Sequence, residues 1–108
     1  MYAYIVIAEN GEITTVKKNK KDVDLCEVRK VIGCDTVEVV RLKERLVMLI
    51  DEDGKFKRSG VNLVATALYS ECIVGNAVVM QVGGDLENMT MEQAHELEKG
   101  WKRLYDGD

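Results

Sequence analysis

The feature that most constrains the fold is a set of short apolar runs rich in β-favouring residues. Residues 2–8 are almost wholly apolar, which is typical of a strand buried at the centre of a sheet. Residues 46–50 read L-V-M-L-I, and residues 74–82 form another strand-like run. No run approaches the ~18 apolar residues that span a bilayer. The sequence therefore predicts the strands of a soluble protein with no membrane partner.

Turn signals between these runs predict that the strands form hairpins. Asn10 and Gly11 favour a tight turn, after which residues 12–17 alternate loosely and form a return strand. Residues 36–42 also alternate, and we expect them to pair with residues 46–50. Strands joined by such short connections are antiparallel, so both pairs favour an antiparallel sheet.

Residues 51–54 read D-E-D-G and resemble the beginning of an EF-hand calcium loop. That loop would place Lys55 at its fifth position and Asn62 at its twelfth, where a bidentate glutamate is required. An ammonium group in the first coordination shell would repel the cation, so we exclude calcium. We expect instead that Asp53 and Gly54 form a hairpin turn into a short strand around Phe56.

Three segments have the spacing and the capping residues of helices. Asp22 is predicted to cap a first helix, which ends at Gly33. Asn62 is predicted to cap the segment L-V-A-T-A-L-Y. Thr90 and Gln93 match a capping box at the start of a final helix. The apolar face of this final helix is expected to comprise Ala94, Leu97, Trp101, Leu104 and Tyr105.

The elements follow one another in the order ββαββ(β)αβα, with strands arriving mostly as hairpins. This order predicts an α+β fold, an antiparallel or mixed sheet of about five to six strands with two to three helices packed on it. A length of 108 residues is typical of one domain, so we expect residues 1–108 to form a single domain.

The charge balance argues against nucleic acid as a partner. The 19 acidic and 15 basic residues give a net charge of -4, which opposes binding to a phosphate backbone. One basic cluster, K-K-N-K-K at residues 17–21, is predicted to be a solvated loop, with contact to a phosphate as the alternative. The three cysteines are widely spaced and lack a C-x-x-C pair, so we expect free thiols in a reducing cytoplasm.

No residue pattern predicts catalysis or a cofactor. The single histidine, His95, has Lys99 where a zinc protease would need a second histidine. The sequence has no G-x-S-x-G nucleophile motif and no G-x-x-x-x-G-K-[ST] phosphate loop. We therefore expect a protein that is not an enzyme and that holds neither a metal nor another cofactor.

Three short motifs carry a resemblance to a known family. They are the D-E-x-G turn at residues 51–54, Asn62 followed by Ala65, and the Val74-Gly75 entry to a strand. Over residues 36–80 the chain resembles a small uncharacterised domain family found in phages, plasmids and Gram-positive bacteria. The family is a domain of unknown function, so the resemblance implies a mobile-element context and no particular reaction.

That context favours a protein that acts by binding, as small phage proteins without catalytic groups commonly do. We expect it to sequester a phosphate-bearing small molecule, a nucleotide immune signal, and so to act against host defence. The alternative is an interaction module that blocks a host protein. A homo-oligomer is expected in particular if a second copy completes the ligand pocket. The predicted ligand-binding residues are Lys57, Arg58, Asn62, Thr66 and Tyr69.

Each of these residues also has a purely structural interpretation. Lys57 and Arg58, with Lys55 nearby, supply charge for a phosphate but are also typical of a solvated turn. Asn62 opens a helix whose free amides favour anions, and it is equally a helix cap. The remaining two residues offer a hydroxyl and a stacking ring, or else a solvated side chain and an aromatic at the edge of the core.

Overall fold

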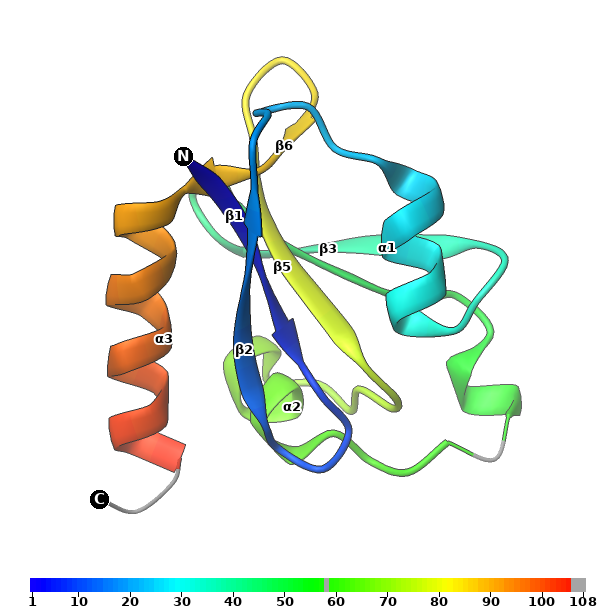
Figure 1. The fold of residues 1–108 in the computed structure, drawn as a ribbon. Coiled ribbons are helices and arrows are strands. Elements are labelled where there is room, and N and C mark those ends of the chain that lie inside the picture. The colour runs from blue at the N-terminus through cyan, green and yellow to red at the C-terminus, as the bar shows by residue number, and fades with distance from the viewer. Residues whose placement is uncertain (58, 106–108) are drawn as a thin grey trace.

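The computed structural model describes residues 1–57 and 59–105, which form an antiparallel sheet with helices on both faces (Figure 1). The strands are β1 (Tyr2–Ile7), β2 (Ile13–Lys18), β3 (Val37–Lys43), β4 (Leu46–Asp51), β5 (Ala77–Val82), β6 (Leu86–Glu87) and β7 (Met89–Thr90). The helices are α1 (Leu25–Ile32), α2 (Leu63–Tyr69) and α3 (Met91–Tyr105), and a 3₁₀ turn, η1, covers Gly54–Phe56. None of these helices is both long and apolar enough to cross a membrane.

The α+β fold predicted from the sequence is confirmed. The main strands are ordered β2-β1-β5-β4-β3, and all their pairs are antiparallel. Both predicted hairpins, β1–β2 and β3–β4, are present, and β5 lies between them. The short strands β6 and β7 pair with β5 and β1, so the sheet has seven strands and is larger than expected.

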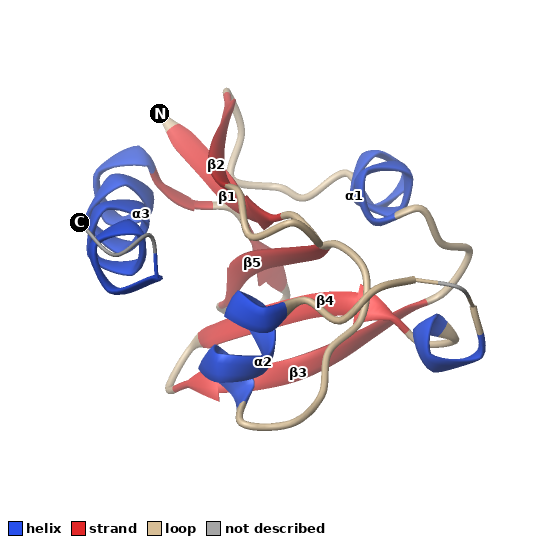
Figure 2. Cartoon of the chain, turned by 90° about the horizontal axis from the view of Figure 1, so that it is seen from below, coloured by secondary structure: helices blue, strands red, loops and turns tan. Residues whose placement is uncertain are grey.

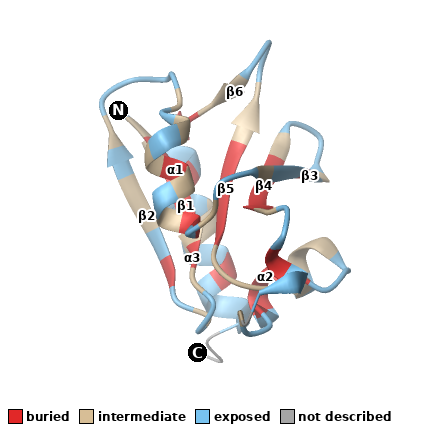
Figure 3. Cartoon of the chain, turned by 90° about the vertical axis from the view of Figure 1, so that its right-hand side faces the viewer, coloured by how far each residue is buried: buried red, intermediate tan, exposed pale blue. Residues whose placement is uncertain are grey.

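The central strands are buried on both faces, which explains their continuous apolar character. On β1, Ile5 packs in a cluster with α2 and α3, whereas Tyr4 packs in a second cluster with α1. Val79 and Val78 of β5 divide between the two clusters in the same way. Figure 2 shows α1 on one side of the sheet and α2 and α3 on the other. In Figure 3 the buried segments run along β4 and β5, whereas the edge strand β3 is largely exposed.

Helix α1 begins later than predicted. Its N-cap is Asp24 and not Asp22, because the Asp24 carboxylate accepts a hydrogen bond from the backbone N–H of Cys26 at 3.0 Å. Asp22 instead forms an isolated β-bridge with Glu87. The predicted end of the helix is confirmed, since Gly33 takes a left-handed φ of 82°.

The prediction of a short strand around Phe56 is wrong. Asp53 has a φ of -101°, and Gly54 is not in the left-handed region, so the backbone does not make the tight hairpin turn. The chain forms η1 instead, and Phe56 is 89% exposed. The position beside β4 that this strand would take is occupied by β5, whose first four residues are buried. Gly54 is suited to its position by its size, because a Cβ there would lie 2.8 Å from a methyl carbon of Val74.

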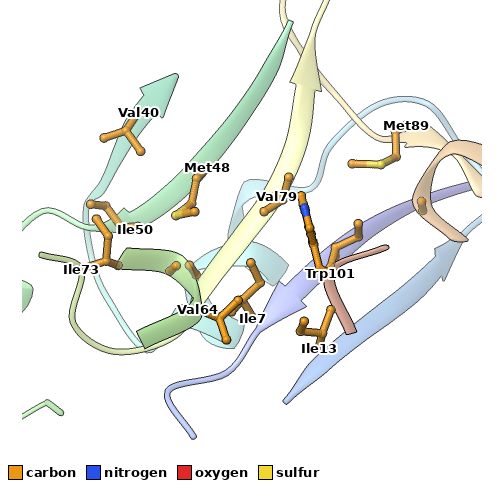
Figure 4. Close-up of a cluster of buried hydrophobic side chains, with 14 of the residues drawn as sticks. Ile7, Ile13, Val40, Met48, Ile50, Val64, Ile73, Val79, Met89 and Trp101 are labelled. Atoms are coloured by element: carbon orange, nitrogen blue, oxygen red, sulfur yellow. The ribbon is translucent and has the colours of Figure 1, made fainter. Parts of the chain in front are cut away.

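The start and the core contact of α3 are confirmed. The Thr90 hydroxyl oxygen accepts a hydrogen bond from the backbone N–H of Gln93 at 3.2 Å, as the capping box predicts. Trp101 is buried in the cluster between α3 and the sheet. Figure 4 shows its ring beside Val79 and Ile13.

The last turn of α3 does not belong to the buried face, which corrects the prediction from spacing. Leu104 is 71% exposed and Tyr105 is 38% exposed. Leu104 lies about 60° around the helix from Trp101, which turns it away from the sheet. Tyr105 is close to the buried line but borders a surface groove, where its ring is only partly covered.

Candidate anion-binding site

A pocket lies between one side of α1, the loop that follows this helix, and Lys57, the residue after η1. It is an open depression on the surface with a volume of about 480 Å³. Its lining residues are Cys26, Arg29, Lys30, Gly33, Cys34, Asp35 and Lys57. The lining thus includes three cationic side chains and one carboxylate, that of Asp35. We call this site the basic pocket.

Helix α1 supplies one wall of the basic pocket through its periodicity. Val28 and Ile32 are buried against the sheet. Residues that are three and four apart share a helix face, so Cys26, Arg29 and Lys30 lie together on another side. The last turn of a helix also favours cations, because its free carbonyl groups carry partial negative charge. Local structure therefore explains why these two cations stand at this end of α1.

Lys57 is held at the pocket by the last residue of β4. The Lys57 Nζ lies 2.7 Å from Asp51 Oδ2, and Asp51 Oδ1 accepts a hydrogen bond from Asp53 N at 2.9 Å. The hydrogen bond and the charge of Asp51 raise the pKa of Lys57, which stays protonated at neutral pH. The Asp51 side chain is nearly buried, whereas that of Lys57 is 43% exposed. The ammonium group is therefore anchored on one side and open on the other.

The two cations on α1 are available to a ligand. Neither Arg29 nor Lys30 forms an ion pair with another residue in the ranges 1–57 and 59–105. The Arg29 Nε is buried and has no hydrogen-bond partner in this part of the chain. Because this Nε is buried, a ligand can approach the Arg29 guanidinium only through its terminal nitrogen atoms.

Two lysines of the cluster at residues 17–21 form ion pairs with glutamates, unlike Arg29 and Lys30 of the basic pocket. Lys18 Nζ lies 2.5 Å from Glu27 Oε1, and Lys21 Nζ lies 3.3 Å from Glu87 Oε2. These carboxylates neutralise part of the cluster, and their charge opposes a phosphate. Lys57 of the basic pocket is also paired, with Asp51, but Arg29 and Lys30 form no ion pair with a described residue, which makes the basic pocket the better candidate for an anion site.

The basic pocket contains two cysteine side chains as well as its charged groups. Burial, and then the negative charge of Asp51, raise the pKa of the Cys34 thiol, so it is protonated at neutral pH. The three cysteines are all free. No group of three or more His, Cys, Asp and Glu side chains in the described ranges is placed to hold a metal ion. Two thiols and three cations form a surface that suits an anion.

The structure brings only part of the predicted ligand site to this pocket. Lys57 lines it, and Lys55 is exposed on η1 without lining it. Arg58 lies outside the described residues. The other predicted residues lie at or on α2, which packs on the face of the sheet that α1 does not cover. They are Asn62, Thr66 and Tyr69.

The Asn62 side chain is committed to the fold. It is completely buried, and its Oδ1 accepts a hydrogen bond from Ala65 N at 3.0 Å. Its Nδ2 donates to Ile7 O at 2.9 Å and to Gly75 O at 2.8 Å. The helix-cap interpretation is confirmed, and the carboxamide has no free group to offer a ligand.

Thr66 and Tyr69 also make structural contacts. The Thr66 hydroxyl accepts a hydrogen bond from Ile73 N at 2.8 Å and lies 3.3 Å from Ile73 O, to which it donates. This bond ties α2 to the segment that leads into β5. Tyr69 is partly buried against the core cluster of α2 and α3. Neither residue lines the basic pocket.

Sequence reasoning missed Arg29 and Lys30. Their signal was a basic pair in the last turn of a helix, spaced three and four residues from Cys26. Such a pair is also typical of any solvated helix end, where it complements the dipole. The pair gains meaning only beside Lys57, which comes from a distant part of the chain.

Comparison with known families identifies the chain. A protein-family model described as a domain of unknown function, DUF3846, matches residues 1–102. The match extends well beyond residues 36–80, which carried the resemblance in the sequence, and it includes most of α3. Comparison with curated proteins and with solved structures found no significant match. Since the family model covers most of its length, this chain is a member of the DUF3846 family.

Proposed function

We propose that the protein binds a small phosphate-bearing molecule, a nucleotide signal, in the basic pocket and sequesters it without chemical change. The observation that carries the proposal is the convergence of Arg29, Lys30 and Lys57 on one pocket of about 480 Å³. The chain as a whole is acidic, with a net charge of -4. The carboxylates of Asp35 and Asp51 stand against these three cations, so one positive charge is left over, which supports an anionic ligand.

The three cations have different roles in this proposal. Arg29 presents a planar group that pairs with two phosphate oxygens at once, whereas Lys30 and Lys57 act as point charges. The ion pair with Asp51 holds Lys57 in place, so less side-chain entropy is lost when a ligand binds. Asp35 repels a bare phosphate and accepts a hydrogen bond from a hydroxyl or amino group. It therefore favours a nucleotide over inorganic phosphate.

The charge state of the pocket supports binding without turnover. The Cys34 thiol is protonated at neutral pH, and a thiol is a far weaker nucleophile than a thiolate. Lys57 is protonated and so cannot act as a base. The ligand would leave the pocket in the form in which it entered.

The biological setting of the proposal follows from the mobile-element context that the family resemblance implies. A protein of this kind would remove a nucleotide signal of host immunity from the host cytoplasm. The expectation is an effect that depends on stoichiometry, because a sequestering protein is saturated by its ligand. Anti-defence activity in cells should therefore rise with the amount of protein produced.

A thermal-shift panel on the full chain tests the proposal. The panel contains cyclic dinucleotides, cyclic ADP-ribose isomers, linear nucleotides and inorganic phosphate. A ligand that binds only the folded state contributes about 2.7 kcal/mol of stability at a hundred times its dissociation constant, so the melting temperature must rise. Chromatography of the ligand released by heat checks that it is unchanged. If no nucleotide raises the melting temperature, the proposal is wrong.

Matched variants locate the site. Arg29→Ala should weaken binding by about tenfold to a hundredfold, because it removes charge-assisted hydrogen bonds to phosphate. Lys30→Ala should weaken it less, and Lys99→Ala, an exposed lysine on α3, should leave it unchanged. Equal binding by the parent, Arg29→Ala and Lys30→Ala would place the ligand elsewhere.

A further inference from the structure

The β1–β2 turn, the entry to α2 and the end of α3 lie at one end of the molecule (Figure 1). Residues from these three segments line a second hollow. Its volume is about 450 Å³, and none of its lining residues belongs to the basic pocket. The lining residues are Glu9, Asn10, Gly11, Glu12, Val61, Leu63, Val64 and Tyr105. We call it the acidic–apolar groove.

Exposed apolar side chains gather at this groove. Leu63 is 74% exposed, Val61 is 48% exposed and Tyr105 is 38% exposed. Single exposed apolar residues are common on protein surfaces, but several around one hollow are typical of an interaction site. Leu63 is the first residue of α2, and the residue after it is buried. The Leu63 side chain is therefore exposed because of its position on the helix, and the rest of the described chain does not cover it.

The charge of the groove has one sign. Glu9 and Glu12 are exposed on the turn that borders it, and neither forms an ion pair with another described residue. No lysine, arginine or histidine is among the lining residues found in the described ranges. An anionic ligand, such as the one proposed for the basic pocket, would be repelled here. A cationic group beside an apolar one would be attracted.

Hydrogen bonds hold the walls of the groove in place. The turn of residues 8–12 is closed by two backbone hydrogen bonds of 2.8 and 2.9 Å. Glu9 N donates to Asn76 Oδ1 at 2.9 Å, which fastens the turn to the segment before β5. Val61 forms a β-bridge with Val74 on the other wall. A groove formed before binding loses little entropy when a partner enters it.

We propose that the acidic–apolar groove docks a short segment of a partner protein that carries an apolar side chain next to lysine or arginine. The apolar side chain would lie against Leu63, Val61 and Tyr105, and the cation would pair with Glu9 or Glu12. Both halves of this complementarity are needed, because rim charges alone contribute little affinity and one apolar contact is not selective. This docking is independent of ligand binding in the basic pocket.

Three matched peptide libraries test the chemistry of the partner. One has a random apolar core flanked by lysine and arginine, one has the same core flanked by glutamate, and one has a serine core flanked by lysine and arginine. Fluorescence anisotropy with the full chain should show binding only to the first, and higher salt should weaken that binding. Failure of the first library to bind, or equal binding of all three, would overturn the proposal.

Variants of the folded protein test the place of docking. Leu63→Ser and Glu12→Lys should each weaken binding of the selected peptide by about tenfold, the former through lost apolar burial and the latter through reversed charge. Val39→Ser is the matched control, because Val39 is an exposed apolar residue on β3 and does not line the groove. Equal loss with Val39→Ser would overturn the proposal. So would a parent that sediments as a dimer and a Leu63→Ser variant that sediments as a monomer, since a second copy would then be the occupant.

Discussion

At the scale of single residues, the polar side chains divide into those that hold the fold and those that remain free. Among the residues that the structure describes, Asn62 and Asn88 are the buried polar ones, and Asn62 makes three hydrogen bonds inside the chain. Arg29 and Lys30 are free of ion pairs with described residues. Lys57 combines the two kinds, because Asp51 holds it while its side chain stays 43% exposed. A ligand can contact unpaired or exposed groups of this sort without breaking the structure.

Asn62→Ala should cost roughly 3 to 5 kcal/mol, because it removes three hydrogen bonds that a completely buried side chain makes to the backbone. Asn10→Ala is the matched control. Asn10 is exposed, and its side chain accepts one hydrogen bond, from Glu12 N at 3.0 Å. Its loss should cost less than about 1 kcal/mol. Urea denaturation measures both, and similar values for the two variants would contradict the structural role of Asn62.

Glu27 gives the protein a dependence on pH. The hydrogen bond from Lys18, and then that from Tyr4, lower the pKa of Glu27 below its ordinary value of 4.5. A carboxylate with a lowered pKa in the folded state stabilises that state above the ordinary pKa. The stabilisation is lost as the pH falls through the lowered value, because protonation removes the charge that Lys18 pairs with.

The expected result is that Glu27→Gln is less stable than the parent at neutral pH, and that this difference shrinks as the pH falls below 4.5. Glu96→Gln, at an exposed position on α3, should differ little from the parent at any pH. Urea midpoints measured across the acid range check this. A difference between Glu27→Gln and the parent that stays constant with pH would contradict the role of the Lys18 ion pair.

At the scale of elements, caps and periodicity account for where helices begin and which faces they bury. The Thr90 cap of α3 and the Asn62 cap of α2 form as predicted. The cap of α1 is Asp24 and not the predicted Asp22. Both aspartates precede the apolar run, and the local sequence does not distinguish them. The backbone of Asp22 forms a β-bridge with that of Glu87, which is distant in the sequence.

Trp101→Ala should cost roughly 3 to 5 kcal/mol, since a large buried ring is removed from the cluster beneath α3. Leu104→Ala removes an apolar side chain from the same helix at a position that is 71% exposed. It should change stability by less than about 0.5 kcal/mol. Denaturant melts of both variants test whether the last turn lies outside the core. A large cost for Leu104→Ala would contradict that conclusion.

At the scale of the whole molecule, β5 joins two hairpins that lie far from it in sequence. It pairs with β1 through residues such as Val79 and with β4 through residues such as Met80. The same assembly places η1 beside the end of α1 and so creates the basic pocket. It also brings the β1–β2 turn, α2 and α3 to one end, where the acidic–apolar groove lies.

The sequence by itself determined the two hairpins, the α+β class and the caps at Asn62 and Thr90. These features rest on turn residues, periodicity and capping, which act within a few residues. It could not determine the position of β5, since each apolar run is equally able to pair with any other. For the same reason it predicted a strand at Phe56 in the place that β5 occupies.

Only the tertiary structure decided which cationic side chains line the same pocket. Arg29 and Lys30 belong to a helix end, and Lys57 belongs to a turn beyond the next hairpin. Spacing along the chain grouped Lys57 with Asn62, Thr66 and Tyr69, but the sheet separates them, because α1 and α2 pack on opposite faces. Periodicity places a side chain on one face of its own element. Which elements face one another depends on burial of the whole apolar surface, a property that no local pattern contains.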